Sequence, residues 1–129
     1  MLNEFLYVQA TPKKGRAVFT SETIAEDTII EISPVIVMTK EDRAYLDKTL
    51  LHDYIFEWGE QQDQCCMALG LIPIYNHSYT SNCEYYMDFE EQMILIKTVR
   101  QVNAGEELTI NYNRDWNDDK KVWFEVEGK

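Results

Sequence analysis

The sequence predicts a mainly β domain with many short strands and one principal helix. Short apolar runs, each bounded by turn residues, recur along the chain. Only one segment shows the three- and four-residue spacing of a helix. The length of 129 residues fits one domain, and a composition that is 45% hydrophobic and 12% aromatic is sufficient for a core. We therefore expect a single domain over residues 1–129.

The expected strands follow the apolar runs in chain order, at residues 5–8, 17–19, 28–38, 84–89, 92–99 and 108–112. A basic turn precedes the second run, and the pair Glu90-Glu91 joins the fourth and fifth runs as a hairpin. A turn ending at Gly105 leads into the last run. Pro34 interrupts the longest run and predicts a break or bulge there, because proline has no N–H for a ladder.

The expected helix begins at Thr39, a suitable N-cap that is followed by acidic residues in the first turn. Its periodic positions are Tyr45, Leu46, Thr49, Leu50, Asp53 and Tyr54. Gly59 is expected to end it. The polar C-terminal stretch 113–129 carries Trp116, Trp123 and Phe124, so we expect this tail to pack back on the domain.

The charge is strongly acidic, with 12 Lys and Arg against 23 Asp and Glu and a net charge of −11. Such a surface repels phosphate backbones, so direct nucleic-acid binding is not expected. Residues 53–99 hold eight acidic residues and one basic residue, Lys97. This segment fits a partner rich in lysine and arginine, although the same charge could serve solubility alone.

The sequence shows no apolar run of the roughly 18 residues that a membrane helix needs, and no secretory signal pattern. Its three cysteines, Cys65, Cys66 and Cys83, form neither a disulfide framework nor a spaced metal motif. We expect reduced thiols in a cytoplasmic protein, with no metal site.

Three polar motifs could carry chemistry. Asn76-His77-Ser78 follows an apolar stretch, and it could be a satisfied turn or a Ser–His nucleophile pair of a hydrolase. Glu106 and Glu107 alternate faces on a strand, so they are unsuited to an acid/base dyad, and one of them is expected to pair with a local basic group. The basic turn at residues 13–17 could hold a carboxylate.

Taken together and in this order, the three motifs resemble the SET domain family. The matching segments are Lys14-Gly15-Arg16-Ala17-Val18-Phe19, Tyr75-Asn76-His77-Ser78 with Asn82-Cys83, and Gly105-Glu106-Glu107-Leu108-Thr109 leading to Tyr112. Residues 53–56 and 68–70 also match, so the resemblance covers about residues 6–116. Within the family the chain looks closest to the compact stand-alone proteins of bacteria and large algal viruses.

The resemblance implies transfer of a methyl group from S-adenosylmethionine (AdoMet) to a lysine side chain, with S-adenosyl-L-homocysteine as product and no metal. It implies a β-clip of small sheets with a C-terminal pseudoknot. The second and third motifs should therefore touch, although 36 residues separate Asn76 from Tyr112. A lysine substrate favours a basic protein or peptide as partner, and the algal viral relatives suggest a homodimer.

The resemblance also assigns roles to single residues. Tyr112 matches the catalytic tyrosine, and Tyr85 and Ile110 would line the substrate channel with it. The residues expected at the cofactor are Lys14, Gly15, Arg16, Ala17, Tyr75, Asn76, His77 and Trp116. The cofactor turn of the family usually has three glycines where this chain has only Gly15, which requires a negative φ at Ala17. This departure favours a second interpretation, a SET-fold binding or assembly module with weakened catalysis.

Overall fold

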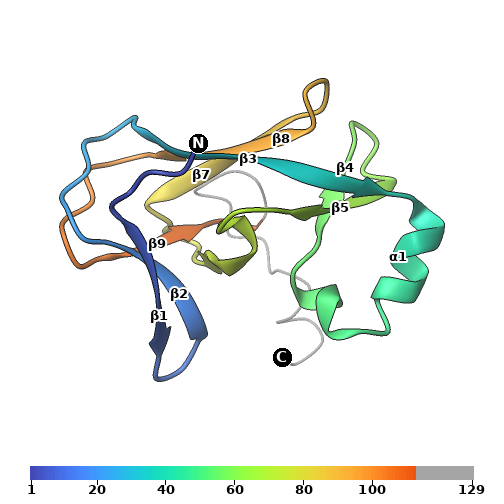
Figure 1. Ribbon diagram of the computed structural model, residues 1–129, viewed down its shortest axis with the longest axis horizontal. Helices are drawn as coiled ribbons and strands as arrows, with labels where there is room; N and C mark the ends of the chain where they lie inside the picture. The colour runs from blue at the N-terminus through green and yellow to red at the C-terminus, as the bar shows by residue number, and fades with distance from the viewer. Residues whose placement is uncertain (113–129) are drawn as a thin grey trace.

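The computed structural model describes residues 1–112 and shows a mainly β architecture, as predicted. Two small sheets meet at an angle, and the α-helix lies at one end of the larger sheet (Figure 1). In chain order the elements are β1 (Leu6–Thr11), β2 (Gly15–Thr20), β3 (Ile29–Met38), α1 (Lys40–Leu46), the 3-10 turn η1 (Leu50–Asp53), β4 (Phe56–Trp58), β5 (Gln64–Ala68), the 3-10 turn η2 (Ile72–Ile74), β6 (Asn76–His77), β7 (Cys83–Asp88), β8 (Met93–Thr98) and β9 (Glu107–Ile110).

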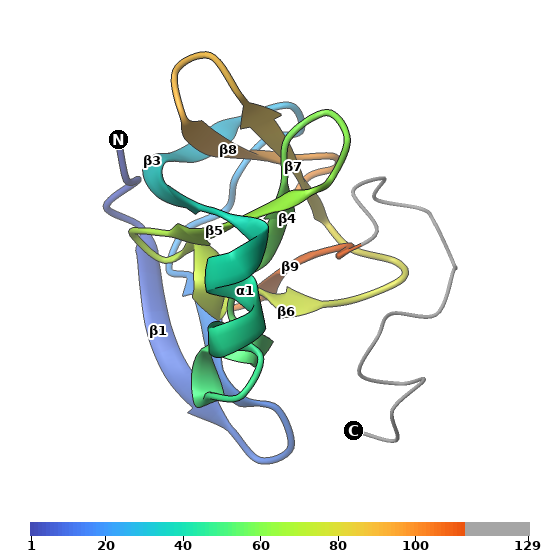
Figure 2. The same cartoon turned by 90° about the vertical axis from the view of Figure 1, so that its right-hand side faces the viewer.

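The four-stranded sheet has the order β1-β2-β9-β6. The last strand, β9, pairs antiparallel with β2, where Val18 faces Leu108. On its other side β9 pairs parallel with β6, where Asn76 faces Thr109. Figure 2 shows β6 and β9 side by side. The two motifs therefore touch, as the resemblance implied, because the last strand is inserted between two segments that precede it in the chain.

The five-stranded sheet has the order β4-β5-β3-β8-β7. The long strand β3 pairs with β8 up to Pro34 and with β5 from Val35 onward. The break predicted at Pro34 is present as a change of partner strand, whereas the register shift of β3 lies between Ile29 and Glu31. Pro34 stands where β3 changes partner, so its missing N–H leaves both ladders intact.

The helix is shorter than the sequence predicted. Thr39 caps it in a capping box with Asp42, as expected. However, α1 ends at Leu46, and Thr49 accepts from the N–H of Leu51 while donating to the carbonyl of Leu46. This local side-chain bonding competes with the helix and starts η1 instead. The β4–β5 hairpin was not predicted.

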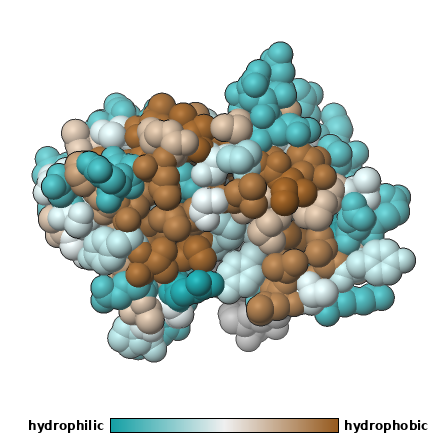
Figure 3. Space-filling model, in the orientation of Figure 1, coloured by the Kyte–Doolittle hydropathy of each residue, from teal (hydrophilic) through white to brown (hydrophobic). Residues whose placement is uncertain are grey.

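One core joins both sheets. Val18 and Leu108 of the smaller sheet pack in the same buried cluster as Ile30, Ile94 and Ile96 of the larger sheet. On the surface, apolar residues form two groups, one over the β1–β2 half and one over the half that carries α1 (Figure 3). No helix in the part of the chain that the structure describes has the length and apolar character needed to cross a membrane.

Candidate active site

The parallel pairing of β6 with β9 brings the second and third motifs into direct contact. The N–H of Ser78 donates to the carbonyl of Ile110 at 3.0 Å, which extends the pairing beyond β6. The N–H of Tyr112 donates to Nδ1 of His77 at 3.0 Å. The His77 ring also lies 5.1 Å from the Tyr112 ring, centroid to centroid. His77 therefore fixes the chain where it leaves β9 and sets the position of Tyr112.

A cavity of about 210 Å³ lies beside this junction. Five of the residues predicted for the site line it, namely Lys14, Gly15, Arg16, Asn76 and Tyr112. Four further residues, from the end of η1, its C-cap and η2, complete the wall, namely Asp53, Tyr54, Pro73 and Ile74. The match of residues 53–56 to the family pattern was the one sequence signal that pointed to Asp53 and Tyr54. The lining thus combines cations, a carboxylate, an amide and aromatic rings.

Gly15 is the one position in the basic turn at residues 13–17 whose backbone conformation favours glycine. Gly15 has φ +72°, a left-handed conformation that favours glycine, and the space where its Cβ would stand is open. The hydroxyl of Thr11 braces the turn, since it donates to the carbonyl of Gly15 and accepts from the N–H of Lys14, both at 2.9 Å. Neither Lys13 nor Ala17 has a positive φ. The negative φ required at Ala17 is therefore present.

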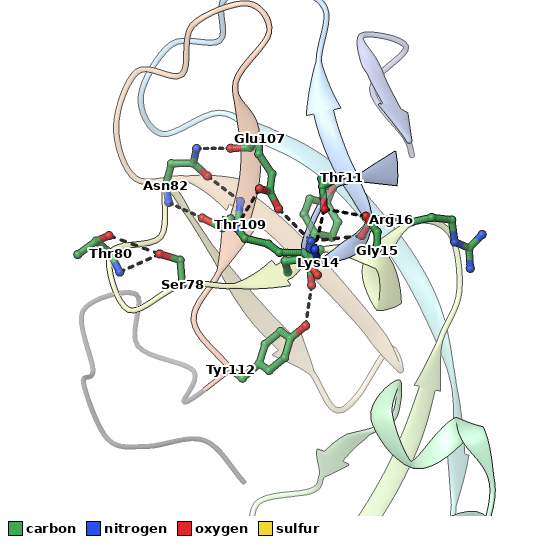
Figure 4. Close-up of polar contacts among 12 residues, drawn as sticks. Thr11, Lys14, Gly15, Arg16, Ser78, Thr80, Asn82, Glu107, Thr109 and Tyr112 are labelled. Carbon is green, nitrogen blue, oxygen red and sulfur yellow. Dashed lines mark hydrogen bonds and ion pairs between the residues drawn. The ribbon is translucent and has the colours of Figure 1, made fainter. Parts of the chain in front are cut away.

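Glu107 connects the basic turn to the second motif. Its Oε1 lies 3.1 Å from Nζ of Lys14, and its Oε2 accepts from Nδ2 of Asn76 at 3.0 Å. The same amide nitrogen lies 3.2 Å from the carbonyl of Arg16. Figure 4 shows Glu107 reaching toward Lys14 at the edge of β9. Glu107 pairs with a basic group, as expected for one of the two glutamates, but the partner, Lys14, is 93 residues away in the chain and is not local.

The side chain of Asn82 clamps β9 from the side. Its Nδ2 donates to the carbonyl of Glu107 at 2.8 Å, and its Oδ1 accepts from the N–H of Thr109 at 2.9 Å (Figure 4). These two bonds replace those that a further strand would make, and they hold the strand that carries Glu107 and leads to Tyr112.

The Tyr112 hydroxyl faces the backbone of the residue before Asn76. It donates to the carbonyl of Tyr75 at 2.8 Å. Burial is the largest cause that raises the pKa of Tyr112 to about 12, and neighbouring Tyr54, Glu107 and Asp53 add to it. The phenol is therefore neutral throughout the physiological pH range, and it serves as a hydrogen-bonding group there.

Tyr85, a predicted channel residue, lies next to Tyr112 but does not line the cavity. Its hydroxyl donates to the carbonyl of Tyr112 at 3.1 Å. The ring of Phe56 lies 5.6 Å from Tyr85 and 6.3 Å from Tyr112, so these three form an aromatic cluster that the sequence did not indicate. Ile110 is fully buried in the core. The channel roles of Tyr85 and Ile110 stay predictions.

Three of the described residues that were predicted at the cofactor lie elsewhere than in the cavity wall. Ala17 is fully buried in β2, and Tyr75 turns its side chain into the core. His77 contacts Tyr112 through the backbone hydrogen bond to its Nδ1 and through the packing of the two rings. Trp116, with the rest of the 113–129 tail, lies outside the described residues. Their cofactor roles are not tested by this geometry.

The hydrolase alternative does not fit the arrangement. The Ser78 hydroxyl contacts Thr80, at 3.4 Å from its hydroxyl and 3.1 Å from its N–H. Nδ1 of His77 accepts from the backbone of Tyr112 instead of activating the serine. Across residues 1–112 no group of three or more His, Cys, Asp or Glu side chains is placed to hold a metal.

The family model of the SET domain matches residues 15–113, which contain every residue of the cavity wall except Lys14. The chain belongs to the SET domain family. The resemblance to SET domain protein-lysine methyltransferases is thereby confirmed, while the bacterial or viral subtype is not tested.

Two fungal relatives of this SET protein carry enzyme names. The Schizosaccharomyces pombe protein named histone-lysine N-methyltransferase, H3 lysine-37 specific, is 35% identical over 123 residues, which are 95% of this chain and 78% of the relative. A Cryptococcus neoformans protein named histone-lysine N-methyltransferase, H3 lysine-36 specific, is 31% identical over 116 residues, which are 84% of this chain but 14% of that protein.

Solved structures share the fold. A Plasmodium falciparum protein described as a candidate histone methyltransferase has a TM-score of 0.67 at 24% identity, covering 91% of this chain and 100% of that one. The structure of ctPRC2 in an autoinhibited conformation bound to S-adenosylmethionine has a TM-score of 0.73 at 18% identity, covering 85% of this chain and 15% of that one. Both likenesses support the predicted β-clip.

Proposed function

We propose that this SET protein transfers a methyl group from AdoMet to the side-chain amine of a lysine in a basic protein. The observation that carries the proposal is the shared cavity. The hydroxyl-bearing Tyr112, the amide-bearing Asn76 and the basic turn around Gly15 come from three distant parts of the chain and line one space. The family membership and the names of the relatives support the same reaction.

The chemistry of the lining fits AdoMet. Lys14 and Arg16 offer positive charge for a carboxylate, and Asp53 offers negative charge for an ammonium group. The absence of a side chain at Gly15 leaves space for a ligand at the backbone of the turn. The ring of Tyr54 offers an apolar surface for a flat ring system. When bound, the cofactor supplies a methyl group that is already activated on a sulfonium.

Tyr112 would orient the substrate amine. A free lysine has a pKa near 10.4, so its amine must lose a proton before it can attack. A phenol with a pKa of about 12 is ionised at a level of only about 10⁻⁵ at pH 7, which makes Tyr112 a poor base there. Its hydroxyl donates to Tyr75, and phenol lone pairs can accept from an amine at the same time. The role supported is alignment of the amine for attack.

We propose a histone tail as the basic substrate. The two fungal relatives are named for lysines at positions 36 and 37 of histone H3. The acidic 53–99 segment supplies charge of the opposite sign to such a tail. The homodimer and the cytoplasmic location also stay proposals. Unpaired apolar surface such as Ile36 and Leu50 supports the first, and three free thiols support the second.

The test combines cofactor binding with radiolabelled methyl transfer. Calorimetry should show AdoMet binding, and label should reach an H3-tail peptide that contains lysines 36 and 37. Tyr112→Phe should bind AdoMet with little change but lose transfer by at least a hundredfold. Binding without transfer to any histone or arrayed basic peptide would favour the binding-module interpretation. Failure of the folded wild-type protein to bind AdoMet would overturn the cofactor assignment.

A further inference from the structure

A buried carboxylate lies behind the site, and the reaction as proposed does not use it. Glu31, on β3, is fully buried. It forms no ion pair with any Lys, Arg or His among residues 1–112. Burying an ionisable group away from a cation is unfavourable, and well-packed apolar residues usually hold two segments together at lower cost. The position of Glu31 therefore calls for a physical explanation.

Three donors converge on Glu31. Oε2 accepts from the hydroxyl of Ser33 at 2.7 Å and from the N–H of Leu71 at 2.8 Å. Oε1 accepts from the hydroxyl of Tyr75 at 2.9 Å. Gly70 makes room for this arrangement, because a Cβ at that position would stand 2.2 Å from Oε2 and 2.4 Å from the Ser33 hydroxyl. The carboxylate is thus enclosed in a cradle that fits it closely.

Two of the donors flank η2, the turn whose Pro73 and Ile74 line the cavity. Leu71 precedes η2 and has no side-chain cap, and Tyr75 follows it. Glu31 therefore holds both ends of this turn from the core side. The turn cannot shift toward or away from the cavity without breaking a bond to a buried charge-bearing group.

Tyr75 connects the cradle to the reacting end of the site. Its side chain donates to Glu31, and its backbone carbonyl accepts from the Tyr112 hydroxyl at 2.8 Å. Two hydrogen bonds, both made by Tyr75, therefore connect Glu31 to the Tyr112 hydroxyl. Tyr75 is thus anchored by its side chain on one side and by its backbone carbonyl on the other, so a displacement of its backbone would strain both bonds.

We propose that Glu31 and the phenol of Tyr75 are positioning residues that set the orientation of the Tyr112 hydroxyl through the Tyr75 carbonyl. The expected change in kcat rests on the proposed function. The expected orientation of the Tyr112 hydroxyl rests on the geometry alone. Neither residue touches the substrate. Their role is to hold the carbonyl, and thereby the Tyr112 hydroxyl, in the orientation that aligns an amine.

Two single-hydroxyl deletions make a matched pair. Tyr75→Phe and Ser33→Ala each remove one buried hydroxyl donor from Glu31, so each leaves the carboxylate with two donors. Only Tyr75→Phe breaks the link to Tyr112. We expect kcat to fall at least tenfold in Tyr75→Phe with KM and the AdoMet dissociation constant within about threefold. We expect kcat within about twofold of wild type in Ser33→Ala, with both variants giving cooperative melts.

A second readout is independent of activity. The Tyr112 ¹³Cζ resonance, assigned with Tyr112→Phe, should move in Tyr75→Phe and in Glu31→Gln but not in Ser33→Ala. If Glu31→Gln does not fold, the Tyr112 resonance in Tyr75→Phe alone tests the positioning role. Equal kcat loss in both hydroxyl deletions, or an unchanged Tyr112 resonance in folded Tyr75→Phe, would overturn the inference. A wild-type protein without transferase activity would overturn the proposed function, and the resonance would still decide the positioning role.

Discussion

Asn82→Ala tests whether the side-chain clamp holds β9 in place. The substitution removes two bonds and leaves two backbone groups without that partner, the part-buried carbonyl of Glu107 and the buried N–H of Thr109. An unsatisfied buried group costs about 1–3 kcal/mol, and partial access of water reduces the sum to about 3 kcal/mol for the pair. With a urea m-value of about 1.5 kcal/mol per M, the unfolding midpoint should fall by about 2 M.

The assay is urea unfolding followed by circular dichroism and tryptophan fluorescence. Asn103→Ala is the control, because Asn103 is exposed and its side chain accepts only from Gln101. We expect its midpoint to stay within about 0.3 M of wild type. Asn82→Asp should be no better than Asn82→Ala, since a carboxylate oxygen would face the carbonyl of Glu107. A fall of less than about 0.5 M in Asn82→Ala would refute the clamp.

Three further predictions follow from the site and the core. Lys14→Ala should weaken AdoMet binding about tenfold in calorimetry. It should change the unfolding free energy by less than about 0.5 kcal/mol, because the ion pair of Lys14 is exposed. An unchanged AdoMet affinity would contradict a role of Lys14 in the site. Because the Tyr112 pKa is raised from 10 to about 12, the folded state keeps a proton that the unfolded state loses. The contribution of Tyr112 to stability should therefore be complete below pH 10 and decline toward pH 12, so the alkaline loss of stability should be smaller in Tyr112→Phe than in wild type. Burial raises the pKa of Cys65 and brings those of Cys66 and Cys83 to about 12, so thiol reagents should label all three only after urea is added; rapid labelling of the native protein would contradict this burial.

The sequence predicted the site and the strands best where turn residues stand next to a motif or an apolar run. The family resemblance predicts that the Lys14–Arg16 turn, the Asn76 motif and Tyr112 share one site, and the structure brings them to one cavity. Short β strands were recognised because their apolar runs end at turn residues. The family pattern supplied the long-range contact between β6 and β9, which no local periodicity could have provided.

The errors arose where local periodicity and tertiary context disagree. The spacing through Tyr54 is helical, but α1 buries no side chain, so no core contact supports an extension past Leu46. The hairpin of β4 and β5 was not predicted, because the expected helix extended over β4 to Gly59 and because β5 contains no Val, Ile, Thr or aromatic residue. Glu31 gave no sequence signal either, since its three donors lie 2, 40 and 44 residues away.

Because β9 is inserted between β2 and β6, the contacts that join the basic turn to the Asn76 motif can form only after β9 has been synthesised. A growing chain that has emerged only as far as β8 holds the basic turn and the Asn76 motif with a missing strand between them. The contacts that unite them span up to 93 residues, from Lys14 to Glu107, so slow, late closure is expected. A ligand that binds both the basic turn and the Asn76 motif would stabilise the folded chain by mass action. A higher cofactor concentration would then raise the fraction of this protein that is folded.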